Sequence, residues 1–244
     1  MIPVQDSVPS RNPAVAMWFI IGANAVVFFL EAHMPRQVLE EFIAKFALVP
    51  ARFAEFQVYE LSDLGRLLAT LVTNTFLHGD WMHFLGNMWT LYIFGDNVED
   101  RMGPLRFTAF YLLSGALASC AHLVTYWGSP VPALGASGAI AAVMGAYFLM
   151  FPTARIVLLV PIFFYPVFVS VYAFLYLPIW FFIQFYQGTL AVVARQSTGI
   201  AFWAHVGGFL AGFVLLPLFL RPRGERRPLQ DDEGVIDLAW WDGG

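Results

Sequence analysis

The sequence predicts an all-α membrane protein: a bundle of six transmembrane helices with a first loop that lies at the membrane interface. Of its 244 residues, 59% are hydrophobic and only 12% are charged, whereas soluble domains carry about 25% charged residues. The mean hydropathy is +0.67. Six apolar segments approach the roughly 20 residues that a helix needs to cross the hydrocarbon core. They are residues 14–31, 80–98, 104–126, 136–152, 155–187 and 200–220.

The polar segments outside these spans have distinct compositions. Residues 1–13 are expected to form a short cytoplasmic N-terminus, ahead of a single domain over 14–220. The loop between the first two spans is nearly fifty residues long and amphipathic, which indicates short helices lying on the membrane interface. Residues 221–244 are polar and rich in proline and glycine, so a disordered cytoplasmic tail is expected there.

The fifth apolar segment is longer than one crossing requires. It contains Pro161, Pro166 and Pro178, and proline bends or ends a helix. The segment is therefore either one kinked helix or a short helix joined to an irregular stretch.

The net charge and the cysteine content argue against some functions, and the positions of Lys and Arg predict how the chain is oriented in the membrane. The net charge of −4 and the single cysteine, Cys120, give no support for nucleic-acid binding, an internal disulfide or a cysteine metal cluster. Short loops on the inner side of membrane proteins are rich in Lys and Arg. If both termini lie inside, the short outer loops contain only Arg195, so this orientation is expected. The inner flanks then hold Arg11, Arg101, Arg106, Arg155, Arg221, Arg223, Arg226 and Arg227.

This orientation brings three polar side chains to one depth. Spans two, four and six run from outside to inside, and they carry His83, Ser137 and His205. Each lies 16 to 18 residues before the arginine at the inner end of its span, or about 24 to 27 Å at 1.5 Å per residue. Polar groups at such depth are costly and face the interior of a bundle. The three residues therefore form a candidate site a little below the outer face.

The residue types at this level suit nucleophilic catalysis. A serine needs a neighbouring base, and histidine has a suitable pKa, so Ser137 with His205 would form a dyad without an acidic third member. His83 and Asn87, four residues apart on one helix face, could donate hydrogen bonds to an oxyanion. Gly135, before Ser137, would let a substrate approach the backbone closely.

Each of these residues also has a purely structural interpretation. Ser137 alone could cap the helix that it begins, and His205 could bond to a neighbouring carbonyl. His83 and Asn87 could join helices, while Gly208 and Gly212 form a stripe of small residues suited to tight packing on span four. Glu99 and Arg101 are expected to form a structural ion pair, and His78 and His122 are expected at interfaces or in loops.

Four short motifs, which occur in the same order as in a known protein family, give the chain a resemblance to that family. "FLHGDWMHFLGNMW", "GDNVEDRMG", "GASGA" and "FWAHVGGFLAG" lie between about residues 70 and 220, and the chain with them resembles the bacterial six-span rhomboid intramembrane serine proteases. The resemblance implies a nucleophile at Ser137, a base at His205 and oxyanion donors at His83 and Asn87. It also implies an endopeptidase that cleaves transmembrane protein substrates in the lipid bilayer of a bacterial inner membrane, without metal or cofactor.

The sequence departs from the family pattern at two points. It lacks the Trp-Arg pair that many bacterial members carry in the first loop. Ala141 stands where some members have a tyrosine that packs on the catalytic histidine, so His205 must be held otherwise, for example by a closer approach of the helices. The proline-broken fifth segment is a candidate lateral gate, unless its prolines only bend it.

Rival functions fit the sequence less well. There is no HExxH motif for a metalloprotease, and Asp80 and Asp96 lie at opposite ends of one span, which excludes an aspartyl dyad. The serious alternative is a catalytically silent rhomboid-like protein that binds membrane clients. Such relatives usually lack the serine or the histidine, and this chain has both.

Overall fold

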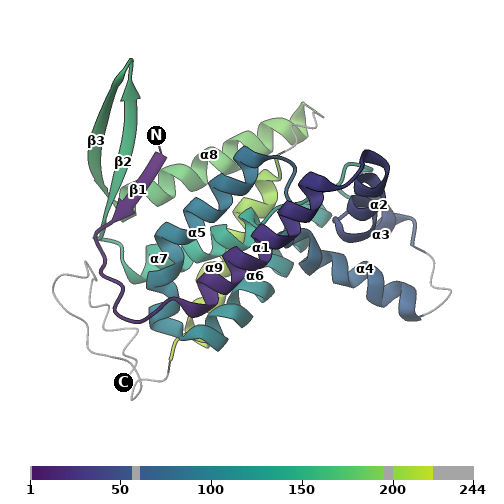
Figure 1. Ribbon diagram of the computed structural model, residues 1–244, viewed down its shortest axis with the longest axis horizontal. Coiled ribbons are helices and arrows are strands. Elements are labelled where there is room, and N and C mark those ends of the chain that lie inside the picture. The colour runs from purple at the N-terminus through teal and green to yellow at the C-terminus, as the bar shows by residue number, and fades with distance from the viewer. Residues whose placement is uncertain (1, 57–60, 195–199, 222–244) are drawn as a thin grey trace.

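The computed structural model describes residues 2–56, 61–194 and 200–221, and it is a helical bundle, which confirms the predicted fold class (Figure 1). A small sheet, which was not predicted, stands beside the bundle. The helices are α1 (Val15–His33), α2 (Arg36–Phe46), α3 (Pro50–Ala54), α4 (Leu61–Thr73), the 3-10 turn η1 (Asn74–Phe76), α5 (Trp81–Met102), α6 (Pro104–Thr125), α7 (Ser137–Met150), α8 (Ala173–Val193) and α9 (Phe202–Phe219). The strands are β1 (Ile2–Asp6), β2 (Arg155–Ile162) and β3 (Tyr165–Tyr172).

Four of the described helices are long and apolar enough to cross a membrane, namely α1, α6, α8 and α9. Helix α7 is apolar but has only 14 residues. Helix α5 has 22 residues but carries several charged side chains in its last two turns. The first loop forms the short helices expected of it, α2, α3 and α4, whereas the predicted tail after residue 221 lies outside the described residues.

Of the two alternatives for the fifth segment, one kinked helix is wrong, and the second is right in its short helix but not in its irregular stretch, which is a β-hairpin. Residues 155–172 form the antiparallel β2–β3 hairpin, and a helix begins only at Ala173. Pro161 and Pro166 lie opposite each other near the turn, where two prolines so close together prevent a helix. The stretch is also rich in β-branched residues, which favour strands. Pro178 alone is accommodated inside α8.

The N-terminal segment completes the sheet instead of standing free as a polar extension. Strand β1 pairs antiparallel with β2, giving the order β1-β2-β3, and the hairpin projects from the bundle next to the start of α8 (Figure 1). Trp89 of α5 donates its indole N–H to the carbonyl of Pro3 at 2.6 Å. The N-terminus is thereby fixed to α5.

Asp6, at the end of β1, is the main polar link between the sheet and the bundle. Its carboxyl group accepts hydrogen bonds from the Tyr147 hydroxyl at 2.5 Å and from the Asn97 amide at 2.8 Å. Burial raises the pKa of Asp6 to about 7, and the nearby Asp96 acts in the same direction, while the bond from Tyr147 opposes it.

Glu99 fixes the start of α1. Its carboxylate accepts the backbone N–H groups of Ala16 and Met17 at 2.9 and 2.7 Å, which have no partner within a first helical turn. The negative charge also suits the positive end of the helix dipole. Glu99 therefore caps the start of α1, whereas the sequence had predicted only an ion pair between Glu99 and Arg101.

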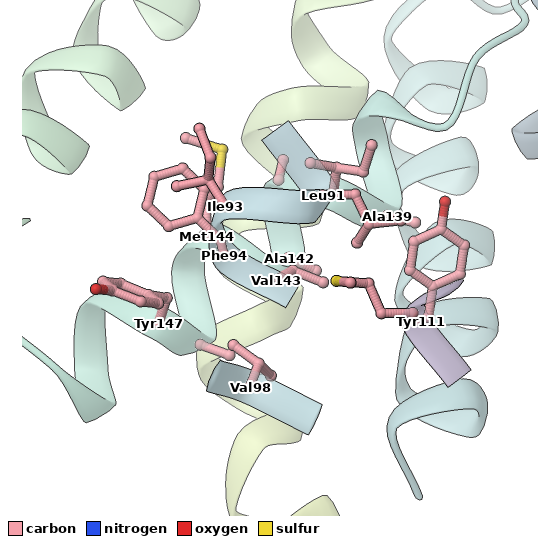
Figure 2. Close-up of a cluster of buried hydrophobic side chains, with 14 of the residues drawn as sticks. Leu91, Ile93, Phe94, Val98, Tyr111, Ala139, Ala142, Val143, Met144 and Tyr147 are labelled. Atoms are coloured by element: carbon pink, nitrogen blue, oxygen red, sulfur yellow. The ribbon is translucent and has the colours of Figure 1, made fainter. Parts of the chain in front are cut away.

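Helix α7 lies at the centre of the bundle, with every residue from Gly138 to Tyr147 buried. Side chains of α5 and α6 surround it, as Figure 2 shows. The labelled core residues are Leu91, Ile93, Phe94 and Val98 of α5, Tyr111 of α6, and Ala139, Ala142, Val143, Met144 and Tyr147 of α7.

Helices α7 and α9 approach so closely that their backbones touch. A Cβ atom at Gly208 would collide with the carbonyl oxygen of Gly138, and one at Gly212 would collide with that of Ala142. In the opposite direction, a Cβ at Gly145 would collide with the carbonyl of Phe209. The predicted tight packing of the small-residue stripe on span four is confirmed.

Gly208→Ala should destabilise the protein, because the added methyl group forces α7 and α9 apart. Overpacking of this kind costs about 1–3 kcal/mol, so the melting temperature in detergent should fall by several degrees. The matched control is Gly22→Ala in α1, where nothing lies within 4 Å of the new atom. Alanine is the better helix former, so that variant should melt at or above the wild-type temperature. Equal melting temperatures for the two variants would contradict the packing described here.

The Asp6 carboxyl should make stability depend on pH. With a folded pKa of about 7 against an ordinary value of 3.8, the folded protein keeps a proton that the unfolded chain releases. Stability should therefore fall as the pH rises from about 4 to 7. Asp6→Asn cannot ionise and should lose less stability over that range, measured as melting temperature at pH 5, 6, 7 and 8. Parallel pH profiles for the two proteins would refute this assignment.

Candidate active site

Ser137 is the first residue of α7, but it does not cap the helix. The N-cap position falls on Ala136, and no side-chain hydrogen bond caps this fully described helix. The Ser137 hydroxyl is instead 2.7 Å from Nε2 of His205 on α9. The hydroxyl at the start of this apolar helix is therefore directed at a base.

His205 is hydrogen-bonded through both ring nitrogens. Its Nδ1 lies 2.8 Å from Oε1 of Gln184 on α8. An amide oxygen can only accept, so this bond places a proton on Nδ1. In the neutral imidazole Nε2 then keeps its lone pair and can accept the hydrogen of the Ser137 hydroxyl, which is the geometry that general-base catalysis requires.

Helix α8 also provides an aromatic neighbour of His205. The ring of Trp180 lies 5.9 Å from the imidazole, centroid to centroid, at an angle of 32°, while Ala141, at the tyrosine position of some relatives, is completely buried. Close helix approach alone does not hold the histidine. Trp180 and Gln184, one turn apart on α8, hold it as well.

Sequence reasoning missed Gln184. The segment from Ile156 to Ala194 contains no Asp, Glu, Lys or Arg. The amide side chains within this segment are those of Gln184 and Gln187. A polar group in such a segment is expected to face the bundle. Gln184 lies four residues after Trp180, so both are on the same helix face. This spacing is the sequence pattern that could have identified Gln184 as a residue facing the bundle.

His83 and Asn87 of α5 reach the site beside Gly135. A Cβ at Gly135 would lie 2.6 Å from Nε2 of His83 and 3.7 Å from Nδ2 of Asn87. Gly135 also has a φ of +128°, in the region that only glycine adopts easily. Its N–H donates to the carbonyl of Asn74 at 2.9 Å.

His78 supports Asn87 from the loop before α5. It is 4% exposed, and burial lowers its pKa to about 4, with a further contribution from His83. Neutral His78 accepts a hydrogen bond from Nδ2 of Asn87 at 3.0 Å. An amide group has two hydrogens, so the second hydrogen of Asn87 remains for another acceptor.

A cavity of about 790 Å³ opens above these residues. His83, Tyr126 and Ala201 are among its lining residues, which come from the start of α5, the ends of α6 and α8, the loop between α6 and α7 and the residues before α9. His122 also lines it and is 9% exposed. It lies in the last turn of α6 and not in a loop. A smaller adjoining cavity of about 20 Å³ borders Ser137 itself.

The residues that the sequence singled out lie together in the structure. Ser137 and His205 are in direct contact, and His83, Asn87 and Gly135 adjoin them on the side of α5. The arrangement combines a serine, a neutral base and polar donors beneath a cavity.

Residues 66–222 match the family described as the Rhomboid domain. The chain belongs to the rhomboid family. With its long apolar helices, it is an integral membrane protein.

Known relatives share moderate sequence identity with the chain. It is 28% identical over 155 residues to Presenilin-associated rhomboid-like protein, mitochondrial, of Mus musculus, covering 60% of the chain and 37% of the relative. It is 26% identical over 156 residues to Rhomboid protein 1, mitochondrial, of Saccharomyces cerevisiae, covering 61% and 40%. RHOMBOID-like protein 5 of Arabidopsis thaliana is 30% identical over 166 residues, covering 63% and 45%. The chain spans less than half the length of these relatives.

Gly135→Ala should destabilise the protein for two separable reasons. The left-handed φ costs a non-glycine residue about 1–3 kcal/mol, and the new methyl group would also collide with His83. Gly128→Ala is the matched control, since Gly128 has a φ of +78° and nothing within 4 Å of its Cβ position. Gly135→Ala should therefore lose more unfolding free energy than Gly128→Ala in detergent titrations.

The same substitution in a His83→Ala protein separates the collision with His83 from the backbone strain at Gly135. In a His83→Ala protein the further loss caused by Gly135→Ala should shrink to that of Gly128→Ala. An undiminished loss would show that His83 does not occupy the space next to Gly135.

Proposed function

We propose that this protein is an intramembrane serine endopeptidase that hydrolyses a peptide bond in or near the transmembrane segment of membrane protein substrates. The observation that carries the proposal is the 2.7 Å contact between the Ser137 hydroxyl and Nε2 of His205. Family membership supports it. The substrate class rests on the family resemblance and on the apolar surroundings of the cluster.

In the first half-reaction the Ser137 oxygen attacks the substrate carbonyl carbon while Nε2 of His205 takes the hydroxyl proton. The tetrahedral intermediate then collapses. His205 gives the proton to the departing amide nitrogen, the carbon–nitrogen bond breaks, and an acyl group remains on Ser137. No metal or cofactor is needed for these steps, because the histidine both removes and returns the proton.

The oxyanion that forms between these steps needs hydrogen-bond donors. The free hydrogen of Asn87 and the ring of His83 lie beside Gly135, next to the nucleophile. The start of α7 adds unpaired backbone N–H groups and the positive end of a helix dipole. Gly135 would let the substrate backbone reach these donors without a side chain in the way.

In the second half-reaction water hydrolyses the acyl-enzyme. The cavity of about 790 Å³ at the outer ends of the helices provides room for water next to the site. A water molecule transfers a proton to His205 and attacks the acyl carbon. His205 then gives this proton to the Ser137 oxygen as the bond between that oxygen and the acyl carbon breaks, which releases the new carboxyl group and restores the hydroxyl.

The membrane of residence is not proposed to be a bacterial inner membrane. That prediction has no support among the relatives, since the mouse and yeast proteins are named as mitochondrial. The proposal is limited to a membrane in which both termini lie on the inner side and the cluster opens toward the outer side.

Cleavage of a single-span model substrate by purified protein in detergent tests the function. Wild type should produce two fragments on a gel. Ser137→Ala and His205→Ala should each reduce the rate by roughly 10³-fold or more, as expected for residues that act as one catalytic unit.

The melting temperatures of both variants should stay close to that of wild type, so that lost cleavage is not lost folding. Retained cleavage in Ser137→Ala would refute the assignment of the nucleophile. A wild-type protein that captures several substrates but cuts none would favour the client-binding alternative.

A further inference from the structure

We propose that Gln184 of α8 is the positioning residue for His205, so that the active arrangement of the dyad depends on α8 being seated against α9. The inference rests on the proposed function, and it concerns a residue outside the four rhomboid motifs. Its basis is the 2.8 Å bond between Gln184 Oε1 and His205 Nδ1, on the side of the imidazole opposite Ser137.

Gln184 selects one of two tautomers. Neutral imidazole carries its proton on either nitrogen, and only the form with the proton on Nδ1 can accept from Ser137. Because Oε1 of Gln184 accepts and cannot donate, it stabilises that form. It also fixes the rotation of the ring about the side-chain bonds, so that Nε2 stays on the line to the Ser137 oxygen.

An amide is a physically reasonable group for this position. A carboxylate would orient the histidine equally well, but a charge at membrane depth is costly. A neutral amide avoids that cost. Gln184 is half-buried, whereas Gln187, one turn further on, is exposed.

Gln184, which accepts the bond from His205, belongs to α8, the least buried of the four candidate membrane spans. Only 17% of the apolar window of α8 is buried, against 33 to 50% for α1, α6 and α9. Helix α8 packs mainly on α9 and makes smaller contacts with α7 and with strands β2 and β3. A shift of α8 away from α9 removes both Gln184 and Trp180 from His205, and leaves the base without its orienting partner.

Kinetics of three variants test the assignment. Gln184→Leu should lower kcat roughly 10- to 100-fold, the usual effect of removing a partner that orients a histidine, with KM unchanged. Gln184→Glu keeps an acceptor at Nδ1 and should retain most of the activity at neutral to alkaline pH. Its carboxylate favours the positively charged imidazole, so the acidic limb of the pH–rate profile should move to higher pH. Gln187→Leu, the matched control on the same helix, should behave as wild type.

Two kinetic outcomes overturn the proposal. One is wild-type kcat and pH profile in Gln184→Leu. The other is an equal loss in Gln184→Leu and Gln184→Glu with an unmoved pH profile, which would make Gln184 a packing residue only.

The ¹⁵N chemical shifts of the His205 ring, assigned with His205→Ala, test the same bond without any turnover. Wild type should show a proton on Nδ1, and Gln184→Leu should show a mixture of tautomers. If wild type proves inactive but has this fixed tautomer, the proposed function fails and the positioning role stands. If wild type is active but Nδ1 carries no proton, the positioning role fails and the function stands.

Discussion

The contact between the backbones of α7 and α9 is the constraint on which the site depends. Gly138, Gly145, Gly208 and Gly212 place no side chain at the points where the two backbones meet, so the helix axes approach more closely than larger residues would allow. Without a strong hydrophobic force between helices in lipid, such close packing is a main source of association. The same approach brings the hydroxyl at the start of α7 to the histidine in the first turn of α9.

The two ends of the bundle have different tasks. At one end, Glu99 holds the start of α1, and Asp6 joins the small sheet to α5 and α7. These links stabilise the scaffold far from the dyad. At the opposite end polar side chains face a cavity, and α8, the least enclosed candidate span, supplies two neighbours of His205. The buried central helix thus carries Ser137, and a less enclosed helix holds its histidine partner.

Residue counts predicted that Ser137, His205 and His83 would lie at one level, from the arginine positions and the helical rise. In the structure Ser137 contacts His205, and His83 lies beside Gly135, so the sequence did single out neighbouring residues. The β2–β3 hairpin was not predictable in the same way, since hydropathy does not distinguish an apolar strand from an apolar helix. Gln184 was missed because its partner lies on another helix, and helix neighbours follow from three-dimensional packing. The docking of β1 depends on pairing with residues about 150 positions away, which local sequence patterns do not reveal.

The most direct test of the account is the reaction of wild-type protein with a fluorophosphonate, followed by peptide mass spectrometry to locate the adduct. The chain contains several serines, and only Ser137 contacts a histidine base among the described hydrogen bonds. The account predicts a single adduct on Ser137 that disappears in a folded His205→Ala variant. Labelling that is absent, spread over several serines, or unchanged without His205 would contradict it.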